Sequence, residues 1–533
     1  MVRTRRQYWI CVAVILCLQI VTMIYFGFQK QNFHVDEYFS YYSSSDNDFY
    51  IGLQDRAWNK SNITIEKCKV HMEERFNYKN VYEMEAKDVH PPLYYYFLHT
   101  ICSFFPETFS KWMGLGLNIF FFAVSFILLE RITWQLSEGN EGLALAVITF
   151  YGFNPAVISA VMFVRMYMLL ALLILLFVYV HLGIVKNHYK FSIKRVAAII
   201  AVSFAGFLTH YYFLVFAGIF SGVFAIMTLI ESRNIKSSIF NFAACLIGTG
   251  AAVLYYPACI EHIFFGYRGE GAQAAFFDLS NTLYRFRYFS HITSRIAFAD
   301  RMKEIFIAGV LAVAAAGIVL WRRRRNNGAL KQYSIWKGAW LSVILATLGY
   351  YLLVAKTALM NEDEMVRYTF PVYGFLFLIV LTGFMIAGKV LVNNKKMRIT
   401  GWGILILGSL ALNLYGMKQG SVLFLYPEQK ERESFAAAHR NAAVIQVYGN
   451  EGLTWEIAEE LTEYPEFYCI SVNDLSEIED DTIENADEIV AYIDHSDGQI
   501  VQQSIQMIQD ASENTIGYKK YFETTYYDVY LFQ

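Results

Sequence analysis

The chain has 533 residues, of which 56% are hydrophobic and 17% aromatic, and its mean hydropathy is +0.32. This composition excludes an ordinary soluble protein and is typical of a polytopic membrane protein. The net charge of −3 hides two opposite parts, because residues 421–533 hold 23 acids and 5 bases and so carry −18, whereas the remainder carries +15. Such a split indicates two environments, a basic membrane part and an acidic tail.

Apolar runs of membrane-spanning length recur from the N-terminus to about residue 418. A span needs about 20 mostly apolar residues. We therefore expect a first module, residues 1–420, with about eleven transmembrane helices at 8–28, 112–129, 142–159, 166–182, 196–209, 213–230, 239–256, 305–321, 336–354, 368–386 and 401–414. The shorter run 92–105 is expected to lie along the surface as a juxtamembrane helix.

Basic clusters alternate regularly with these spans. They fall at the N-terminus and at 186–195, 233–236, 322–325 and 389–398, all of which the predicted topology places on one side. Because Lys and Arg concentrate in cytoplasmic loops, this bias predicts a cytoplasmic N-terminus and an extracytoplasmic C-terminus. The loops at about 29–91 and 257–303 are then outside, and the first span is predicted to be an uncleaved signal anchor.

The acidic tail, residues 421–533, has a different pattern. Short apolar runs at 443–448, 467–471, 488–493 and 526–532 predict strands, and 455–461 and 499–508 predict helices. Alternating strands and helices indicate a small α/β domain. It has no phosphate-binding Gly loop and no nucleophile elbow, so an extracytoplasmic accessory or docking domain is the expected role.

The seven cysteines are scattered along the chain. They form no CxxC pair and have no ligand spacing with histidine, so no zinc site is predicted and no residue is assigned to a metal. A disulfide among Cys68, Cys259 and Cys469 is left open, because sequence alone does not define pairing.

Asp36 and Glu37 follow directly on the first span, in the stretch NFHVDEYFS at 32–40. Acids at an outer membrane end are most often ordinary solvated charges. A carboxylate at the interface can also take a proton from an acceptor hydroxyl, or hold a divalent cation beside a phosphate. The pair therefore indicates a catalytic site only in combination with other residues.

His90 precedes Pro91 and Pro92, and the two prolines suit the first turn of a helix. His90 then lies at the positive end of that helix, where an anion can bind. A structural turn is the plainer interpretation of this motif alone.

Other polar groups share the predicted outer side. Arg165 and Arg367 stand at span ends and are expected to face a cavity rather than lipid, although the acids at 362–364 are ordinary ion-pair partners for Arg367. Lys111 and His210 are also boundary residues, and each alone is more often snorkelling or capped than catalytic. Together, acids and bases at one interface suit a lipid-linked phosphate, because bases bind the phosphate and a carboxylate activates the nucleophile.

The order of these motifs resembles a known superfamily. Asp-Glu after the first span is followed by His-Pro-Pro-Leu-Tyr-Tyr at 90–95, Arg-Met-Tyr at 165–167 and Arg-Tyr at 367–368. The combination resembles the GT-C superfamily of polytopic glycosyltransferases. It is most similar to the protein O-mannosyltransferase and aminoarabinose-transferase branch, in its bacterial dolichyl-phosphate-mannose–protein mannosyltransferase-like form. The resemblance covers about residues 1–385 and leaves the tail uncovered.

By that resemblance the donor is a sugar on polyprenyl phosphate, and transfer occurs on the outer side of the cell membrane. Asp36 matches the first-loop acid of the family, with Glu37 beside it, and Lys111 stands where the family has a phosphate-binding arginine. Relatives often carry an acid two residues before the Arg of Arg-x-Tyr, and here that place is Phe163. This departure puts in doubt a metal site built on a second carboxylate, for which 362–364 is the alternative source. A divalent cation is the one cofactor left open.

The predicted function is an integral-membrane glycosyltransferase that moves a hexosyl or pentosyl group from a polyprenyl-phosphate donor to an extracytoplasmic protein, lipid or cell-wall glycan. Asp36 and Glu37 are the predicted catalytic residues. The predicted substrate-binding residues are His90, Tyr94, Lys111, Arg165, Tyr167, His210, Arg367 and Tyr368. Two alternatives stay open: a transporter or flippase of lipid-linked sugars, which would need charges near span midplanes and an internal repeat, and a non-catalytic membrane anchor for the tail. No nucleic-acid partner is expected.

Overall fold

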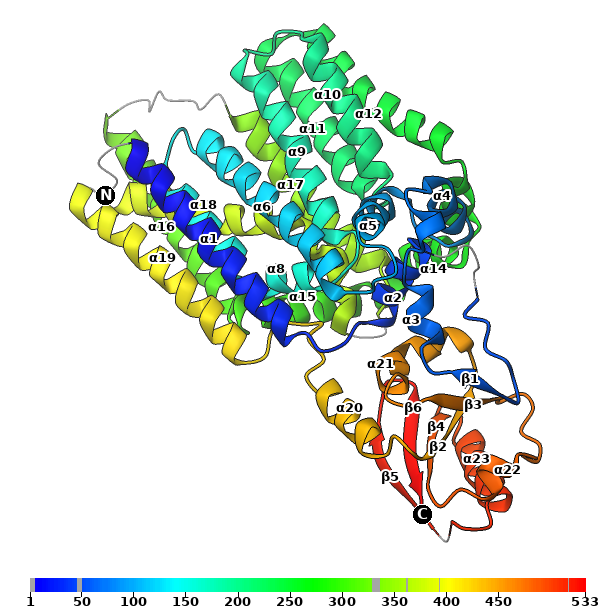
Figure 1. Cartoon of the computed structure of the whole chain (residues 1–533). Coiled ribbons are helices and arrows are strands. Elements are labelled where there is room, and N and C mark those ends of the chain that lie inside the picture. The colour runs from blue at the N-terminus through cyan, green and yellow to red at the C-terminus, as the bar shows by residue number, and fades with distance from the viewer. Residues whose placement is uncertain (1–4, 46–49, 328–335, 361–362, 393, 516) are drawn as a thin grey trace. The chain divides into compact units, whose positions relative to one another are not determined.

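The computed structural model describes residues 5–45, 50–327, 336–360, 363–392, 394–515 and 517–533. It is mostly helical and divides into two compact units (Figure 1). The first unit contains Met1–Phe28, Glu85–Tyr94 and Gly114–Phe424, and the second contains Gln29–Met84, Tyr95–Met113 and Leu425–Gln533. Each unit has its own buried core.

Nine helices in the described ranges are long and apolar enough to cross a membrane, which confirms a polytopic helical membrane protein. Six of them are single helices of the expected kind: α1 (Arg5–Gln29), α6 (Lys111–Leu136), α9 (Tyr167–Lys186), α11 (Phe213–Ser232), α12 (Ile235–Tyr255) and α17 (Lys337–Thr357). The other three are in α16 (Met302–Asn327), in η3 (Asp363–Val372) continued by α18 (Tyr373–Leu391), and in α19 (Lys395–Lys418).

A tenth candidate span is a bent pair of helices. α7 (Glu141–Gly152) and α8 (Pro155–Met162) meet at 51°, where the sequence predicted one span at 142–159. Pro155 causes the break, because it has no N–H to donate to the preceding turn and suits the first position of a new helix. Asn154 caps α8 by accepting a backbone N–H at 3.1 Å.

The remaining helices of the first unit are shorter: α10 (Ile193–Phe207), α13 (Ala258–Phe264), α14 (Tyr267–Phe277), η2 (Leu279–Asn281) and α15 (Thr282–Phe298). α10 is the predicted span 196–209. Its 15 residues make a helix about 22 Å long, which is shorter than the roughly 30 Å hydrocarbon core of a bilayer. α13, α14, η2 and α15 lie within residues 257–303, so the loop predicted there is largely helical.

α9 is the span with the largest share of its apolar window buried, 72%. It packs against α10 and η3. α11 pairs with α17, and α10 pairs with α12 (Figure 1). A helix that is apolar on every side is expected where protein surrounds it. α9 carries Tyr167 at its start, so this packing gives the Arg-Met-Tyr motif a rigid support.

The second unit is built on one six-stranded sheet with the order β1-β3-β2-β4-β6-β5. The strands are β1 (Ala57–Lys60), β2 (Ala443–Tyr448), β3 (Glu466–Ser471), β4 (Ile489–Asp494), β5 (Tyr518–Glu523) and β6 (Tyr527–Phe532). β2 pairs parallel with β3 and with β4. β1 pairs antiparallel with β3, and β6 pairs antiparallel with β4 and with β5. α23 (Gly498–Ala511) covers one face, and α20 (Gln429–Ala438) with α21 (Ala458–Leu461) covers the other. The sheet confirms the predicted α/β fold of the tail.

Two strands and one helix differ from the sequence-based expectation. β1 comes from the first loop and pairs with β3 in the register Trp58↔Tyr468, a contact between segments about 400 residues apart. β5 was not predicted, because its side chains are mostly exposed and lack an apolar face. The predicted helix at 455–461 begins as a 3₁₀ helix, η4 (Glu451–Ile457), and becomes α-helical in α21.

The other helices outside the spans are α2 (Val35–Ser43), α3 (Ile63–Lys67), η1 (Met72–Glu74), α4 (Tyr78–Lys87), α5 (Leu93–Phe104) and α22 (Asp481–Glu484). α5 is the predicted short helix at 92–105, and it has 12 residues. All seven cysteines are free, so the disulfide left open by the sequence is absent from the structure.

Candidate functional site

Asp36 and Glu37 lie in the first turn of α2, in the second unit. His34 caps this helix, because its Nδ1 accepts the Asp36 N–H at 3.0 Å and the Glu37 carboxylate accepts the His34 N–H at 2.8 Å. This reciprocal arrangement is a capping box, which satisfies two backbone donors. Both acids therefore stand at the positive end of a helix, where negative charge is stabilised.

The two acids have different surroundings. Glu37 Oε2 lies 2.9 Å from Lys30 Nζ, and both side chains are fully buried. Burial lowers the pKa of Lys30, although the Glu37 carboxylate opposes that shift. The Asp36 side chain is 20% exposed. Glu37 is therefore engaged in a structural ion pair, and Asp36 is the carboxylate that solvent reaches.

Lys111 is the third predicted site residue of the second unit. Its ammonium donates to the backbone carbonyl of Lys30. Tyr41 of α2 donates its hydroxyl to the Ser110 carbonyl at 3.0 Å, and Tyr38 stacks on the Trp455 ring at 5.4 Å. The first two contacts join the Lys111 segment to Lys30 and to α2.

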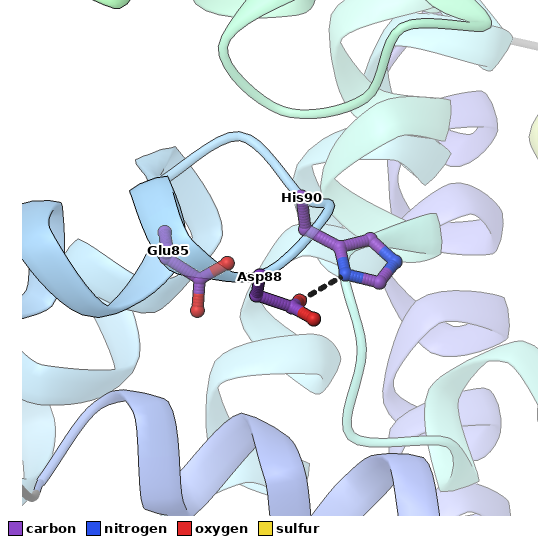
Figure 2. Close-up of side chains that lie close together, drawn as sticks. All are labelled: Glu85, Asp88 and His90. Carbon is purple, nitrogen blue, oxygen red and sulfur yellow. Dashed lines mark hydrogen bonds and ion pairs between the residues drawn. The ribbon is translucent and has the colours of Figure 1, made fainter. Parts of the chain in front are cut away.

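In the first unit, His90 lies between a carboxylate and a guanidinium. Its Nδ1 is 2.6 Å from Asp88 Oδ2, as Figure 2 shows, and its Nε2 is 3.2 Å from Arg165 Nη2. Guanidinium nitrogens only donate, so Nε2 accepts and Nδ1 carries the proton that it donates to Asp88. Burial alone would raise the pKa of Asp88, but His90 and Arg165 together hold the pKa of this carboxyl below its ordinary value.

Tyr94 is fully buried and lies behind this group. Its hydroxyl donates to Asn118 Oδ1 at 3.3 Å. The Asn118 amide donates to the carbonyls of Val161, at 3.1 Å, and Phe163, at 2.8 Å. These carbonyls belong to the backbone that leads directly to Arg165. Tyr94 is thus linked through Asn118 to the backbone that precedes Arg165.

Arg367 is 2% exposed and lies over two aromatic rings. Its guanidinium carbon is 5.1 Å from the Phe163 ring centre and 5.5 Å from the Tyr368 ring centre, within the range of cation–π attraction. Tyr167 stacks on Phe163 at 5.8 Å and meets Tyr368 edge-on at 5.6 Å. Three predicted residues thus form one cluster, and the ring of Phe163 occupies the place where the resemblance implied an acid.

Acids close to Arg367 in sequence were the predicted ordinary ion-pair partners of this residue. Asp363 forms an ion pair with Arg295 at 2.6 Å. Glu362 lies outside the described residues.

His210 follows α10 and is 8% exposed. Its Nδ1 accepts the Tyr212 N–H at 3.1 Å, so Nε2 carries the proton. The ring stacks on Tyr212 at 5.2 Å. Burial lowers the pKa of His210, and the positive charge of Arg165 lowers it further, to about 3. His210 is therefore a neutral N–H donor at physiological pH.

A cavity of about 610 Å³ in the first unit is lined by several of these side chains. The apolar part of its lining includes Phe264, Phe276, Phe277, Leu353 and Leu359. Its polar part includes His90, His210, Tyr212, His262, Arg268 and Tyr368. Such a lining suits an amphiphile that has an apolar chain and a polar or anionic group.

The predicted residues are distributed over both units. Asp36, Glu37 and Lys111 belong to the second unit; the first contains His90, Tyr94, Arg165, Tyr167, His210, Arg367 and Tyr368. Sequence reasoning missed Lys30, Asp88 and Glu85. A signal existed for two of them, because Lys30 and Asp88 are polar residues close to motifs that the sequence singled out.

No protein-family model matches the chain, and a search of curated proteins found no match. Among solved structures, the chain is similar to ArnT from Cupriavidus metallidurans bound to undecaprenyl phosphate, with 11% identity, 98% of this chain and 97% of that chain covered, and a TM-score of 0.49. It is also similar to the archaeal oligosaccharyltransferase AglB from Archaeoglobus fulgidus in complex with an inhibitory peptide and a dolichol-phosphate. There the identity is 9%, the coverage 98% of this chain and 74% of that chain, and the TM-score 0.45. Neither structural similarity is high enough to assign a function to this chain.

Proposed function

We propose that this protein is an integral-membrane glycosyltransferase that moves a sugar from a polyprenyl-phosphate donor to an extracytoplasmic acceptor. The observation that carries the proposal is the cavity of about 610 Å³, whose wall combines Phe276, Phe277 and Leu353 with His90 and His210. A sugar on polyprenyl phosphate has matching parts, because it joins an apolar chain to an anionic phosphate and a polar sugar. Pockets of this kind orient a ligand with a few polar groups on an apolar wall.

The phosphate is proposed to contact cations and neutral donors at this cavity, where the lining residues His90 and Tyr368 contact Arg165 and Arg367. Arg165 and Arg367 are 4% and 2% exposed, and a guanidinium offers paired N–H groups that match the oxygens of a phosphate. His210 adds a neutral N–H donor. Lys111, in the second unit, is proposed to bind phosphate on the ground of the sequence resemblance alone. His90 is proposed to position the donor through its contact with Arg165 at 3.2 Å.

The proposed reaction is a single displacement with inversion. An acceptor hydroxyl oxygen forms a bond to the anomeric carbon while the bond from that carbon to the phosphate oxygen breaks. Asp36 takes the hydroxyl proton as general base, and polyprenyl phosphate leaves with the electron pair and the negative charge. Cations placed at the leaving oxygen stabilise the charge that develops there. Asp36 is preferred to Glu37 as the base because Glu37 is fully buried against Lys30.

The reaction is proposed to occur on the extracytoplasmic side. The basic clusters at 186–195, 233–236, 322–325 and 389–398 support this orientation, because such clusters remain in the cytoplasm. The acceptor is a protein, a lipid or a cell-wall glycan that reaches the outer surface.

The test is a transfer assay with the purified full-length chain. A panel of radiolabelled polyprenyl-phosphate sugars is supplied with membrane extract as the acceptor, and the wild type is compared with Asp36→Asn. The matched control is Glu73→Gln, which neutralises an exposed acid of the same first loop. We expect label to move from lipid to acceptor with the wild type and the control, and Asp36→Asn to lose at least about 100-fold, in line with general-base loss.

Two outcomes would contradict the proposal. An active Asp36→Asn variant would remove the assignment of the base. A folded protein that transfers no sugar from any donor, yet moves a lipid-linked sugar across a liposome membrane without acceptor, would be a transporter instead.

A further inference from the structure

The helix that carries Asp36 is too short to set its own orientation. α2 has nine residues, and an isolated helix of this length is unstable in water, so its position depends on the segments that pack against it. Residues two apart on a helix point in nearly opposite directions, and residues four apart share a face. Tyr38 and Tyr42 are buried on one side of α2, and Asp36 lies on the opposite side.

The C-terminal domain, residues 425–533 of the second unit, supplies an aromatic anchor for the buried side of α2. Trp455 of η4 is 1% exposed. Its ring stacks on that of Tyr38, with the centres 5.4 Å apart, and lies 5.7 Å from the ring of Tyr42. Phe39 meets the same ring edge-on at 6.4 Å. Since aromatic pairs contribute beyond the area that they bury, one side chain of the C-terminal domain holds α2 at three positions.

A buried hydrogen-bond network joins the same domain to the segment that precedes α2. Asn32, the first residue of the motif, donates its amide N–H to Gln429 Oε1 at 2.8 Å. Asn32 Oδ1 accepts the Phe33 N–H at 2.7 Å and the hydroxyl proton of Tyr38 at 3.0 Å. Asn32, Tyr38 and Gln429 are all buried. Because a buried polar group is costly to leave without its partner, this network fixes the direction in which the chain enters α2.

Two more contacts connect the C-terminal domain with this part of the first loop. The Gln31 N–H donates to the Leu425 carbonyl at 2.8 Å. Glu459 Oε1 of α21 lies 3.3 Å from the Tyr38 hydroxyl. Contacts from α20, η4, α21 and the strand of chain before α20 therefore converge on residues 31–42, the stretch that contains Asp36.

We propose that Trp455 and Gln429 are positioning residues, which hold α2 so that Asp36 is presented to the acceptor hydroxyl. The catalytic part of this inference rests on the proposed function, in which Asp36 is the general base. A base must lie within about 3 Å of the proton that it takes, and a misplacement of about 1 Å can lower a rate on the order of 100-fold. The acidic C-terminal domain is then a component of the active site and not only an accessory domain.

The first measurement needs no substrate. Hydrogen–deuterium exchange is followed by mass spectrometry in the purified full-length protein, with the wild type beside Trp455→Leu. The variant loses the three ring contacts, so the amides of α2 should exchange at least about tenfold faster, whereas those of β4 keep the wild-type rate. The matched control is Phe532→Leu, because Phe532 is a fully buried ring of the same domain that packs in the core beneath α23. It should leave exchange in α2 unchanged.

The second measurement connects this packing with transfer, at equal amounts of folded protein. Trp455→Leu should lower kcat at least about tenfold and leave the KM for the donor within about twofold, because the base is displaced and the donor cavity is intact. Trp455→Phe keeps a ring against Tyr38 and should retain most of the wild-type rate. In the Asp36→Asn background, Trp455→Leu should cause less than about a twofold further loss, because a residue that acts through the base has no effect once the base is gone.

A second variant keeps the proposal falsifiable if Trp455→Leu does not fold. Gln429→Ala removes the bond to Asn32 and should lower kcat roughly fivefold, again with an unchanged KM for the donor. Wild-type exchange of α2 in both variants would overturn the positioning role. Equal losses with and without Asp36 would also overturn it, because the contacts would then stabilise the domain and nothing more. Faster exchange of α2 in a protein whose wild type transfers no sugar would refute the proposed function and the catalytic part of the inference, while the attachment of α2 to the C-terminal domain would stand.

Discussion

The carboxylate of Glu37 lies 2.9 Å from the ammonium of Lys30, and both groups are fully buried. Asp36, the adjacent acid, also lies in the first turn of α2, but its side chain is 20% exposed. Two neighbouring carboxylates of the same motif thereby differ, because one is held in a buried ion pair and solvent reaches the other. This separation makes their substitutions distinguishable.

Glu37→Gln is expected to destabilise the protein more than Asp36→Asn does. Removing one partner of a buried ion pair leaves an uncompensated charge, at a cost of about 3–5 kcal/mol. The midpoint of thermal unfolding in detergent measures the effect. The double variant Lys30→Met/Glu37→Met removes both charges and should lose less than Glu37→Gln alone. Equal midpoints for the wild type and Glu37→Gln would contradict the assignment of this pair.

Asn118→Ala is expected to reduce transfer more than Tyr94→Phe. Asn118 donates two hydrogen bonds to the backbone before Arg165, whereas Tyr94→Phe removes a single bond of 3.3 Å. At about 1 kcal/mol for each bond, Asn118→Ala should lower the transfer rate by roughly tenfold or more. Rates are compared at equal amounts of folded protein. If both variants have the wild-type rate, the position of Arg165 does not depend on this network.

Phe163→Leu is expected to weaken donor binding. The substitution keeps an apolar side chain but removes the ring that lies 5.1 Å from the Arg367 guanidinium. Cation–π contacts of partly desolvated groups contribute about 1–2 kcal/mol, so the KM for the donor should rise by roughly tenfold. Phe424→Leu is the control, because Phe424 stacks on Phe163 at 4.2 Å and its loss leaves the ring of Phe163 in place. A similar change of KM in both variants would mean that packing, and not the cation, is responsible.

His210 is expected to make the protein less stable in acid. Its pKa of about 3 in the folded protein is below the ordinary value of about 6.5 for an unfolded chain. Between these two pH values the unfolded state binds a proton that the folded state does not bind. Stability therefore falls as the pH drops below about 6.5. The loss at pH 5 is on the order of 2 kcal/mol for this group. His210→Gln keeps a neutral N–H donor and should show a smaller drop in unfolding midpoint between pH 8 and pH 5; an identical drop would contradict the prediction.

Much of the architecture was predictable because it depends on local information. Runs of about 20 apolar residues predicted the spans that the structure places in α1, α6, α9, α11, α12 and α17. The strands β2, β3, β4 and β6 were predicted because short apolar runs bounded by turns are sufficient to recognise them. The bend between α7 and α8 was missed, although Pro155 was visible, because hydropathy does not report the direction of a helix.

The sequence by itself determined the composition of the membrane part, the acidic tail and the motifs that contain Asp36, His90, Arg165 and Arg367. Only the tertiary structure decided which neighbours these residues have. The burial of Glu37 against Lys30, the ring of Phe163 beside Arg367, and the pairing of β1 with β3 are contacts that hydropathy and motif order do not encode. The physical reason is that burial and charge pairing depend on segments that folding brings together from distant parts of the chain, whereas spans and strands depend on residues that are adjacent in it.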